Sequence, residues 1–384
     1  MLYEFILLVC LWLSEKQLLR YCIHWGDSLL KLNEPMIFDG HNDVLLKLMV
    51  NGGVDKAGSF VTGRDGHIDI PRANTGGFGG GFFALYVRSP MNGKSLDDKY
   101  DEMKQPQYDV PLPAPVSQAA ALPVIMEEIA ILLRLQELGA LKICHTTDDL
   151  RGCFASGQMA AIMHMEGAEA IDADLHTLEV LHAAGLRSLG PVWSRDTIFG
   201  YGVPFRFPSD GNIGGGLTEA GFGLVKRCNA LGIMLDLSHL NEAGFWDIAK
   251  TTDAPLVATH SNVHAICNHA RNLTDKQLAA IAESDGMVGL NYACAFLRED
   301  GQMDMDTPLD TMLRHLDYMI GKLGEDRVGL GSDFDGAWVP EPITDVAGLN
   351  NLRTAMRAHG YDEPLMRKLC HENWLRVLDK TWKE

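Results

Sequence analysis

The sequence lacks the cysteine patterns that mark a disulfide framework or a zinc ribbon. Its eight cysteines include no CxxC pair and follow no regular spacing, so we interpret them as reduced, mostly buried thiols. Basic residues are also scarce, with 33 lysines and arginines against 51 aspartates and glutamates and a net charge of −18. This balance argues against nucleic acid or an anionic membrane surface as a partner.

The chain also lacks a convincing membrane-spanning or signal segment. The apolar run from Phe5 to Leu13 is well short of the roughly 20 residues that cross a bilayer. Glu4 stands where a secretory signal carries basic residues, and no small-residue cleavage site follows. We therefore expect residues 1–35 to be an amino-terminal extension and residues 36–384 to form one folded domain. This favours a cytoplasmic protein, with export as the alternative if residues 1–35 are a genuine signal.

From Met36 onward the chain alternates apolar, β-rich runs with longer helical patterns. The eight strand candidates lie near residues 36–39, 80–87, 160–166, 186–193, 232–238, 255–260, 286–291 and 327–333. The run at 232–237 is apolar nearly throughout, which is typical of a parallel sheet covered on both faces. Eight such β and α units in succession predict a (β/α)8 TIM-type barrel. A doubly wound open sheet is the competing architecture, but no dinucleotide-binding glycine fingerprint follows the first strand.

The segments between these strands add detail to the prediction. Thr218, Asn241 and Thr274 each precede a periodic segment and are suitable helix caps. Residues 89–123 and 200–216 have the composition of long loops, and we expect them to lie over the mouth of the barrel. The tail from 349 to 382 is predicted to be helical and amphipathic, with Trp374 packed against the barrel wall.

Acidic and imidazole side chains recur where the predicted strands end. His41 and Asp43 follow the first strand and lie on the same side of it, because strand side chains alternate. The other strand ends of this kind carry Glu166, His239, His260 and Asp333. Each residue alone is most simply a solvated polar group at a strand end. Three histidines and three carboxylates at one barrel mouth are what a two-metal hydrolytic site requires.

These motifs, in this order, resemble the membrane (renal) dipeptidase family in its bacterial form. They are Phe38-Asp39-Gly40-His41-Asn42-Asp43, Glu166-Gly167, Leu235-Asp236-Leu237-Ser238-His239, Thr259-His260-Ser261-Asn262, Ala270-Arg271-Asn272 and Gly329-Leu330-Gly331-Ser332-Asp333-Phe334-Asp335-Gly336. The resemblance covers the chain from about Ile37 to its carboxyl end. It implies a barrel metallodipeptidase with two Zn²⁺ per chain, which hydrolyses small dipeptides, including ones with a D-residue at the carboxyl end.

The resemblance also implies roles for individual residues. His41, Asp43 and Glu166 would hold one zinc ion, and Glu166, His239 and His260 the other, so that Glu166 bridges the two. A metal-bridging hydroxide would attack the peptide carbonyl. Asp333 would pass its proton to the leaving amine, and Arg271 would bind a substrate carboxylate or the tetrahedral oxyanion.

One position departs from the family pattern. Trp193 stands where the family usually carries a histidine after the fourth strand. Arg195, two residues on, is our candidate for the missing donor to the oxyanion. We expect Trp193 and Tyr292 to contact the substrate together with Arg271.

Two other functions remain open from the sequence. One is an amidohydrolase-type barrel enzyme acting on a cyclic amide or ester, although such enzymes usually carry two histidines in the first motif, where His41 and Asp43 stand here. The other is a catalytically silent homologue that binds metal or peptide, for which Trp193 is the only argument. The expected partner is a small dipeptide, and the sequence does not decide between a monomer and a homodimer.

Overall fold

Eight parallel strands form a ring that is closed except for a short junction. The computed structural model describes residues 34–89 and 100–382, and its strands follow the order β8-β6-β5-β2-β1-β11-β10-β9. Between the two ends of this path, a bridge joins Asp236 to Val257, and the Leu237 N–H donates to the Val257 carbonyl at 2.8 Å. The predicted (β/α)8 barrel is therefore confirmed.

The barrel strands match the eight sequence candidates in order. Their bounds are β1 (Ile37–Asn42), β2 (Phe78–Tyr86), β5 (Ala160–Glu166), β6 (Leu186–Gly190), β8 (Met234–Leu235), β9 (Val257–Ala258), β10 (Met287–Asn291) and β11 (Val328–Gly331). A short ninth strand, β4 (Lys142–Ile143), pairs with β5 outside this path. Every barrel strand runs into a loop at the same end, as parallel strands must.

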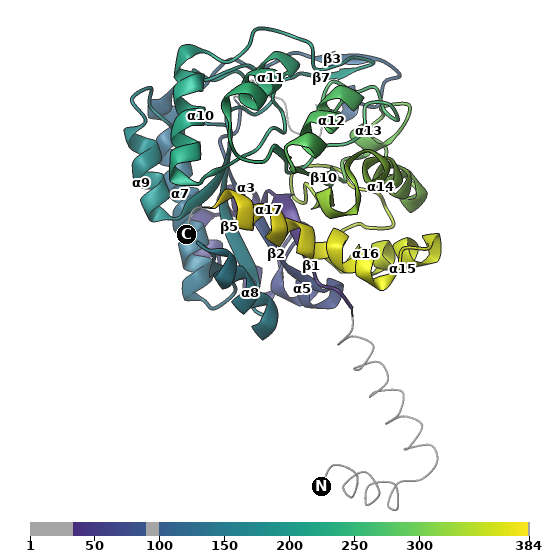
Figure 1. The fold of residues 1–384 in the computed structure, drawn as a ribbon. Helices are drawn as coiled ribbons and strands as arrows, with labels where there is room; N and C mark the ends of the chain where they lie inside the picture. The colour runs from purple at the N-terminus through teal and green to yellow at the C-terminus, as the bar shows by residue number, and fades with distance from the viewer. Residues whose placement is uncertain (1–33, 90–99, 383–384) are drawn as a thin grey trace, which may run out of the picture. The chain divides into compact units, whose positions relative to one another are not determined.

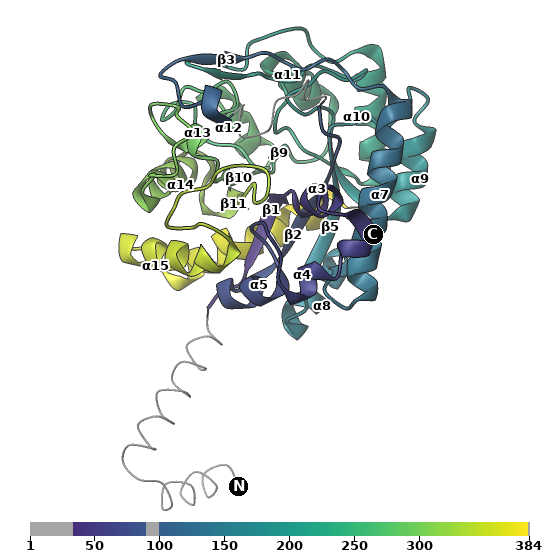
Figure 2. The ribbon, with the colours of Figure 1, turned by 180° about the vertical axis from the view of Figure 1, so that it is seen from behind.

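Helices surround the strands, as Figures 1 and 2 show from opposite sides. Their bounds are α3 (Val44–Val50), α4 (Ser59–Thr62), α5 (Ile70–Gly76), α7 (Gln118–Glu137), α8 (Thr147–Ser156), α9 (His176–Ala184), α10 (Glu219–Leu231), α11 (Glu242–Thr251), α12 (Asp275–Glu283), α13 (Cys294–Leu297), α14 (Leu309–Leu323), α15 (Leu349–His359), α16 (Glu363–Arg367) and α17 (Asn373–Thr381). The three predicted caps are confirmed, since the side chains of Thr218, Asn241 and Thr274 accept from the backbone N–H groups of Gly221, Gly244 and Gln277.

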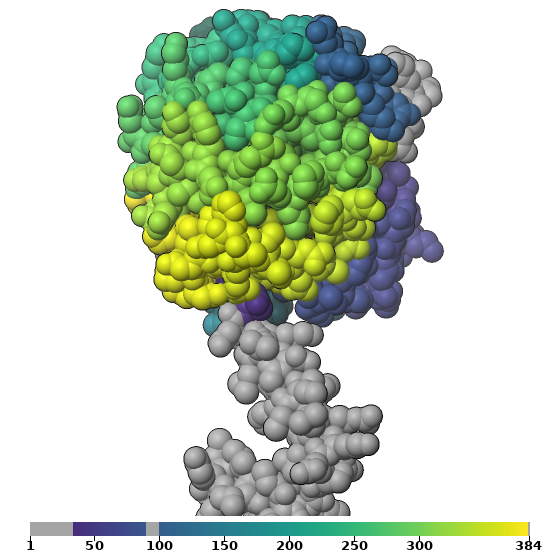
Figure 3. All heavy atoms as spheres, turned by 90° about the vertical axis from the view of Figure 1, so that its right-hand side faces the viewer, coloured from purple at the N-terminus to yellow at the C-terminus, as the bar shows by residue number. Residues whose placement is uncertain are grey.

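The carboxyl-terminal helices close one end of the barrel. In Figure 3 they form a continuous yellow surface beside the green segment of the chain. Trp374 of α17 is fully buried, its ring lies 5.1 Å from Phe82, and its indole N–H donates to the Leu330 carbonyl at 3.2 Å. A side chain at Gly40 would meet the Trp374 ring at 2.5 Å, so the strand carries glycine where the indole enters. We call Phe38, Phe82, Ile162, Met287 and Trp374 the floor cluster.

Two predictions about loops need correction. Residues 89–123 are not all loop, because β3 (Tyr108–Val110) pairs antiparallel with β7 (Phe205–Phe207) and α7 already begins at Gln118. The strand pairing links segments about 100 residues apart, which no local pattern reveals.

Pro123 lies inside α7. The burial of apolar side chains on that helix, such as Ala121 and Ile125, stabilises it by more than the loss of the backbone hydrogen bond that proline removes.

The amino-terminal prediction falls almost wholly outside the described residues. Residues 1–33 and 90–99 are not part of the described structure, so the proposed extension at 1–35 stays a prediction. Within the described ranges, no helix combines the length and the apolarity that a bilayer crossing demands.

Candidate metal centre and active site

Five side chains converge where β1, β5, β8 and β9 end. Glu166 Oε1 lies 3.1 Å from His239 Nε2, 3.4 Å from His260 Nε2 and 3.6 Å from His41 Nε2. Asp43 Oδ2 is 3.4 Å from His41 Nε2. We call these five residues the metal cluster. The structure thus brings together all five side chains that the sequence suggested as metal ligands.

Two of the imidazoles are held from behind, so that their Nε2 atoms face inward. His239 Nδ1 lies 2.8 Å from the Ser194 hydroxyl, and His260 Nδ1 lies 2.8 Å from the Thr259 hydroxyl. The two Nε2 atoms are 3.1 Å apart. Hydrogen bonds of this kind fix ring orientation and tautomer in metal-binding histidines.

The electrostatics of the cluster favour a bound cation. Burial lowers the pKa of His239 and of His260 well below the usual value, which keeps both in the neutral form that binds metal. Burial also lowers the pKa of His41, but the carboxylates of Glu166 and Asp43 outweigh it and raise that pKa to about 10. The carboxylates around His41 therefore attract positive charge, which a bound metal cation would supply.

The donor set fits a metal ion on geometric grounds as well. Neither ring nitrogen of His41 has a hydrogen-bond partner in the part of the chain that the structure describes. Ligand atoms of His41, Glu166 and His260 all lie within 4.8 Å of one another, and so do those of His41, Asp43 and Asp333. Imidazole nitrogens with carboxylate oxygens are the ligands that Zn²⁺ takes in catalytic sites.

The backbone around the cluster is held in unusual conformations. His239 and Asp333 have φ angles of 66° and 59°, in the left-handed region that residues other than glycine rarely adopt and that is common at functional sites. A side chain at Gly336 would lie 2.1 Å from Asp43 Oδ2 and 2.5 Å from Asp333 Oδ1. The glycine therefore permits the two carboxylates to approach each other.

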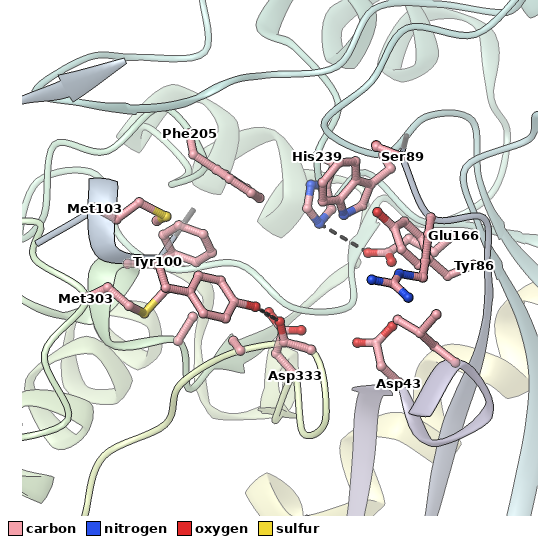
Figure 4. Close-up of a pocket in the computed structure, with 17 residues that line it drawn as sticks. Asp43, Tyr86, Ser89, Tyr100, Met103, Glu166, Phe205, His239, Met303 and Asp333 are labelled. Carbon is pink, nitrogen blue, oxygen red and sulfur yellow. Dashed lines mark hydrogen bonds and ion pairs between the residues drawn. The ribbon is translucent and has the colours of Figure 1, made fainter. Parts of the chain in front are cut away.

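A pocket of about 780 Å³, its opening included, lies over the metal cluster. In Figure 4, Asp43, Glu166 and His239 lie on one side of it, and Met103, Met303 and Phe205 lie on the other. Its lining combines apolar and aromatic side chains with a few polar groups, as small-molecule sites do. A ligand bound there would contact metal-binding groups at one end and apolar side chains at the other.

The structure places Asp333, Arg271 and Trp193 at or beside this site. Asp333 and Trp193 line the pocket, and Trp193 lies with its ring centre 5.6 Å from that of His239. Arg271 is buried and donates from Nη2 to the His260 carbonyl at 3.1 Å, while burial lowers its pKa to about 10 against the raising effect of Asp333 and Glu166. Its Nε has no partner among the described residues.

Arg195 and Tyr292 are not brought to the pocket, contrary to expectation. The Arg195 guanidinium is fully buried and donates to Glu169 Oε1, the Ser89 hydroxyl and the Val87 carbonyl at 2.7–2.8 Å. Its donors are thus engaged by the protein, which argues against the oxyanion role. Tyr292 is fully buried in the main apolar core, because the preceding Asn291 faces the site, where its Nδ2 donates to Asp333 at 2.9 Å, and successive strand side chains alternate.

Sequence reasoning missed Arg88, which lines the pocket just beyond β2. An arginine after a strand is not a metal ligand, so Arg88 does not stand out in the sequence as the histidines and carboxylates do. The signal was available, because Arg88 follows directly on the predicted strand at 80–87.

Buried histidines and carboxylates beside a pocket at a barrel mouth define a metal-dependent hydrolase. Comparison with known proteins gives the family. Residues 30–383 match the model of the membrane dipeptidases, peptidase family M19, and the chain belongs to that family. It is a metallodipeptidase, which decides against the other amidohydrolase-type alternative.

Relatives of the chain support this assignment. A metallopeptidase of Rhodobacter sphaeroides, crystallised with a phosphinate mimic of the dipeptide L-Ala-D-Ala, is 55% identical, with a TM-score of 0.89 over 91% of this chain and 100% of that chain. A dipeptidase described as a metallopeptidase of family M19 is also 55% identical, with a TM-score of 0.87 over 90% of this chain and 99% of that chain. An uncharacterised protein from the pqqA 5′ region of Klebsiella pneumoniae is 47% identical over 68% of this chain and 97% of its own length.

Proposed function

We propose that the protein is a zinc-dependent dipeptidase that hydrolyses small dipeptides, including those with a D-residue at the carboxyl end. The observation that carries this proposal is Glu166, whose Oε1 atom lies among three histidine Nε2 atoms at 3.1–3.6 Å. Support for the substrate comes from the Rhodobacter sphaeroides relative, which binds a mimic of L-Ala-D-Ala.

The metal cluster would hold two zinc ions, with His41 and Asp43 on one, His239 and His260 on the other, and Glu166 shared. When bound, zinc acidifies water and polarises a peptide carbonyl. The protein contributes ligands whose orientation is fixed in advance, since Ser194 and Thr259 hold two of the rings. That preorganisation lowers the entropic cost of assembling the site.

Asp333 is the proposed proton carrier. It lines the pocket and lies close enough to His41 and Asp43 to share a metal site with them. We propose that its carboxylate takes a proton from the attacking water and returns it to the departing amine. Asn291, which donates to Asp333 Oδ2 at 2.9 Å, keeps one oxygen in place so that the other is free to exchange the proton.

Arg271 is the proposed stabiliser of negative charge. Its guanidinium is buried next to the His260 backbone and has Nε without a partner among the described residues. A fixed cation at this depth stabilises charge that develops on the carbonyl oxygen, because little water screens it.

The proposal is tested by stripping the protein with a chelator and returning zinc in measured amounts. Hydrolysis of L-Ala-D-Ala and of L-Ala-L-Ala is then followed by release of free alanine. We expect no hydrolysis without metal, recovery with zinc, and cleavage of the D-containing dipeptide. Cleavage of the L,L dipeptide alone would overturn the stereochemical part, and hydrolysis that survives chelation would overturn the metal dependence.

A further inference from the structure

Arg88 is the sole lysine or arginine among the described residues that line the pocket. It is exposed, and no hydrogen bond or ion pair to its guanidinium is found within residues 34–89 and 100–382. Carboxylates at the same pocket, Asp43, Glu166 and Asp333, belong to or adjoin the metal cluster. A cation at this pocket with no partner among the described residues is suited to binding an anionic ligand.

The residues on both sides of Arg88 are held by one buried side chain. Arg195 donates from Nη2 to the Val87 carbonyl and from Nη1 to the Ser89 hydroxyl, each at 2.7 Å. Arg195 is itself held by Glu169, whose Oε1 accepts from its Nε at 2.8 Å. Because Arg195 holds both Val87 and Ser89, the position of the Arg88 backbone between them is fixed.

Glu169 ties this arrangement to the metal cluster. It lies three residues after Glu166 and is nearly fully buried, and burial raises the pKa of its carboxyl against the lowering effect of Arg195. A substituent at Gly167 would lie 2.5 Å from Glu169 Oε2, so the glycine leaves room for the carboxylate to turn back toward Arg195. The end of β5 therefore sets the position of the segment that follows β2.

We propose that Arg88 binds a carboxylate of the dipeptide, either the terminal one or that of an acidic side chain, and that Arg195 with Glu169 is its positioning pair. This inference rests on the proposed dipeptidase function and assigns one end of its substrate. The guanidinium fork matches a carboxylate with two parallel hydrogen bonds.

The test measures binding of three phosphinate mimics to the zinc-loaded protein by calorimetry. The mimics copy L-Ala-D-Ala, its carboxyl-terminal amide and L-Ala-D-Asp. The variant is Arg88→Met, and the matched control is Arg134→Met on α7, an exposed arginine paired with Glu137. If Arg88 holds the terminal carboxylate, we expect its loss to weaken the L-Ala-D-Ala mimic about 10- to 100-fold, the scale of a charge-assisted contact, and to leave the amide unchanged.

If Arg88 holds a side-chain carboxylate instead, only the L-Ala-D-Asp mimic weakens in Arg88→Met. Equal affinity of wild type and variant for all three mimics, or an equal loss for the amide and the free acid, would overturn the proposal. Kinetics on the matching dipeptides should show the change in KM more than in kcat. A wild type that binds the mimics but cleaves no dipeptide would overturn the proposed function alone, since the affinity ratios still decide the role of Arg88.

The positioning role is tested by coupling. Ser89→Ala removes one acceptor of Arg195 and should weaken binding of the favoured mimic about 3- to 10-fold when Arg88 is present. The same change in the Arg88→Met background should have almost no effect. An equal loss in both backgrounds would show that Ser89 acts independently of Arg88 and would contradict the positioning role.

Discussion

The two ends of the barrel interior are both buried, yet they are filled by opposite kinds of side chain. The floor cluster is apolar, with Trp374 fully buried against Phe82 and its indole N–H satisfied by a strand carbonyl. The metal cluster at the mouth contains carboxylates and imidazoles, and neither ring nitrogen of His41 has a hydrogen-bond partner there among the described residues. Burying polar groups without partners costs free energy. We therefore infer that the floor stabilises the fold and that the mouth is arranged for the metal.

The largest effect is expected from a change at Glu166, the residue at the centre of the metal cluster. Glu166→Gln keeps the size of the side chain but removes the charge shared by the metal ligands. We expect kcat/KM on the best dipeptide to fall by at least about 10⁴-fold, or more than about 5 kcal/mol. The metal-free variant should stay close to the wild type in stability, because losing the charge that faces His41 is offset by removing a carboxylate whose burial is itself unfavourable. Urea unfolding in chelator measures this, and a clear loss of stability would contradict the division of roles.

A change in the floor cluster should have the opposite effect, with a loss of stability and little loss of activity. Trp374→Ala should lower the free energy of unfolding by about 3–5 kcal/mol, because it removes a large buried ring and leaves a cavity. The folded fraction should keep its zinc affinity and nearly its kcat, since the indole does not reach the metal cluster. Trp374→Phe, which retains most of the apolar volume, is the matched control. A Trp374→Ala protein of wild-type stability would remove the floor from the account.

Arg195 lies near the mouth of the barrel, but we expect it to stabilise the fold, as the floor cluster does. Arg195→Met removes the partner of Glu169 and leaves a buried carboxylate unpaired, so we expect a loss of about 3 kcal/mol in stability. Adding Glu169→Gln should restore part of it, because the uncompensated charge disappears. Urea unfolding of the two single variants and the double variant measures the coupling. Additive losses would mean that the pair contributes nothing as a pair.

His164 lies between the two ends, with its ring centre 5.5 Å from that of His41 and 6.0 Å from that of Phe82. Burial lowers its pKa to about 3, so the folded state keeps it neutral while the unfolded state takes up a proton below about pH 6.5. Its contribution to stability is complete above pH 6.5 and is lost as the pH falls toward 3. When the pH is lowered from 7.5 to 5.0 in chelator, the free energy of unfolding of His164→Asn should fall by about 2 kcal/mol less than that of the wild type. An identical pH dependence would show that His164 does not titrate on unfolding.

Sequence patterns predicted the barrel because the strands lie in mainly apolar runs, and because Thr218, Asn241 and Thr274 lie directly before their helices. The same patterns predicted the metal cluster, since parallel strands end on one side and His41, Glu166 and His260 each lie at or just after the end of a strand. The β3–β7 pair escaped prediction because pairing over a long separation leaves no local signal. The misplacement of Arg195 and Tyr292 has a related cause: spacing along the chain does not say whether a side chain turns to the pocket or to the core.

The most direct test of the central claim is a calorimetric titration of zinc into chelated wild-type protein and Glu166→Gln, with L-Ala-D-Ala hydrolysis measured at each step. The account predicts two zinc ions per wild-type chain, activity that rises as they bind, and a lower zinc stoichiometry with no hydrolysis in the variant. Two zinc ions bound by Glu166→Gln with wild-type activity would contradict it, as would a wild type that is fully active without metal.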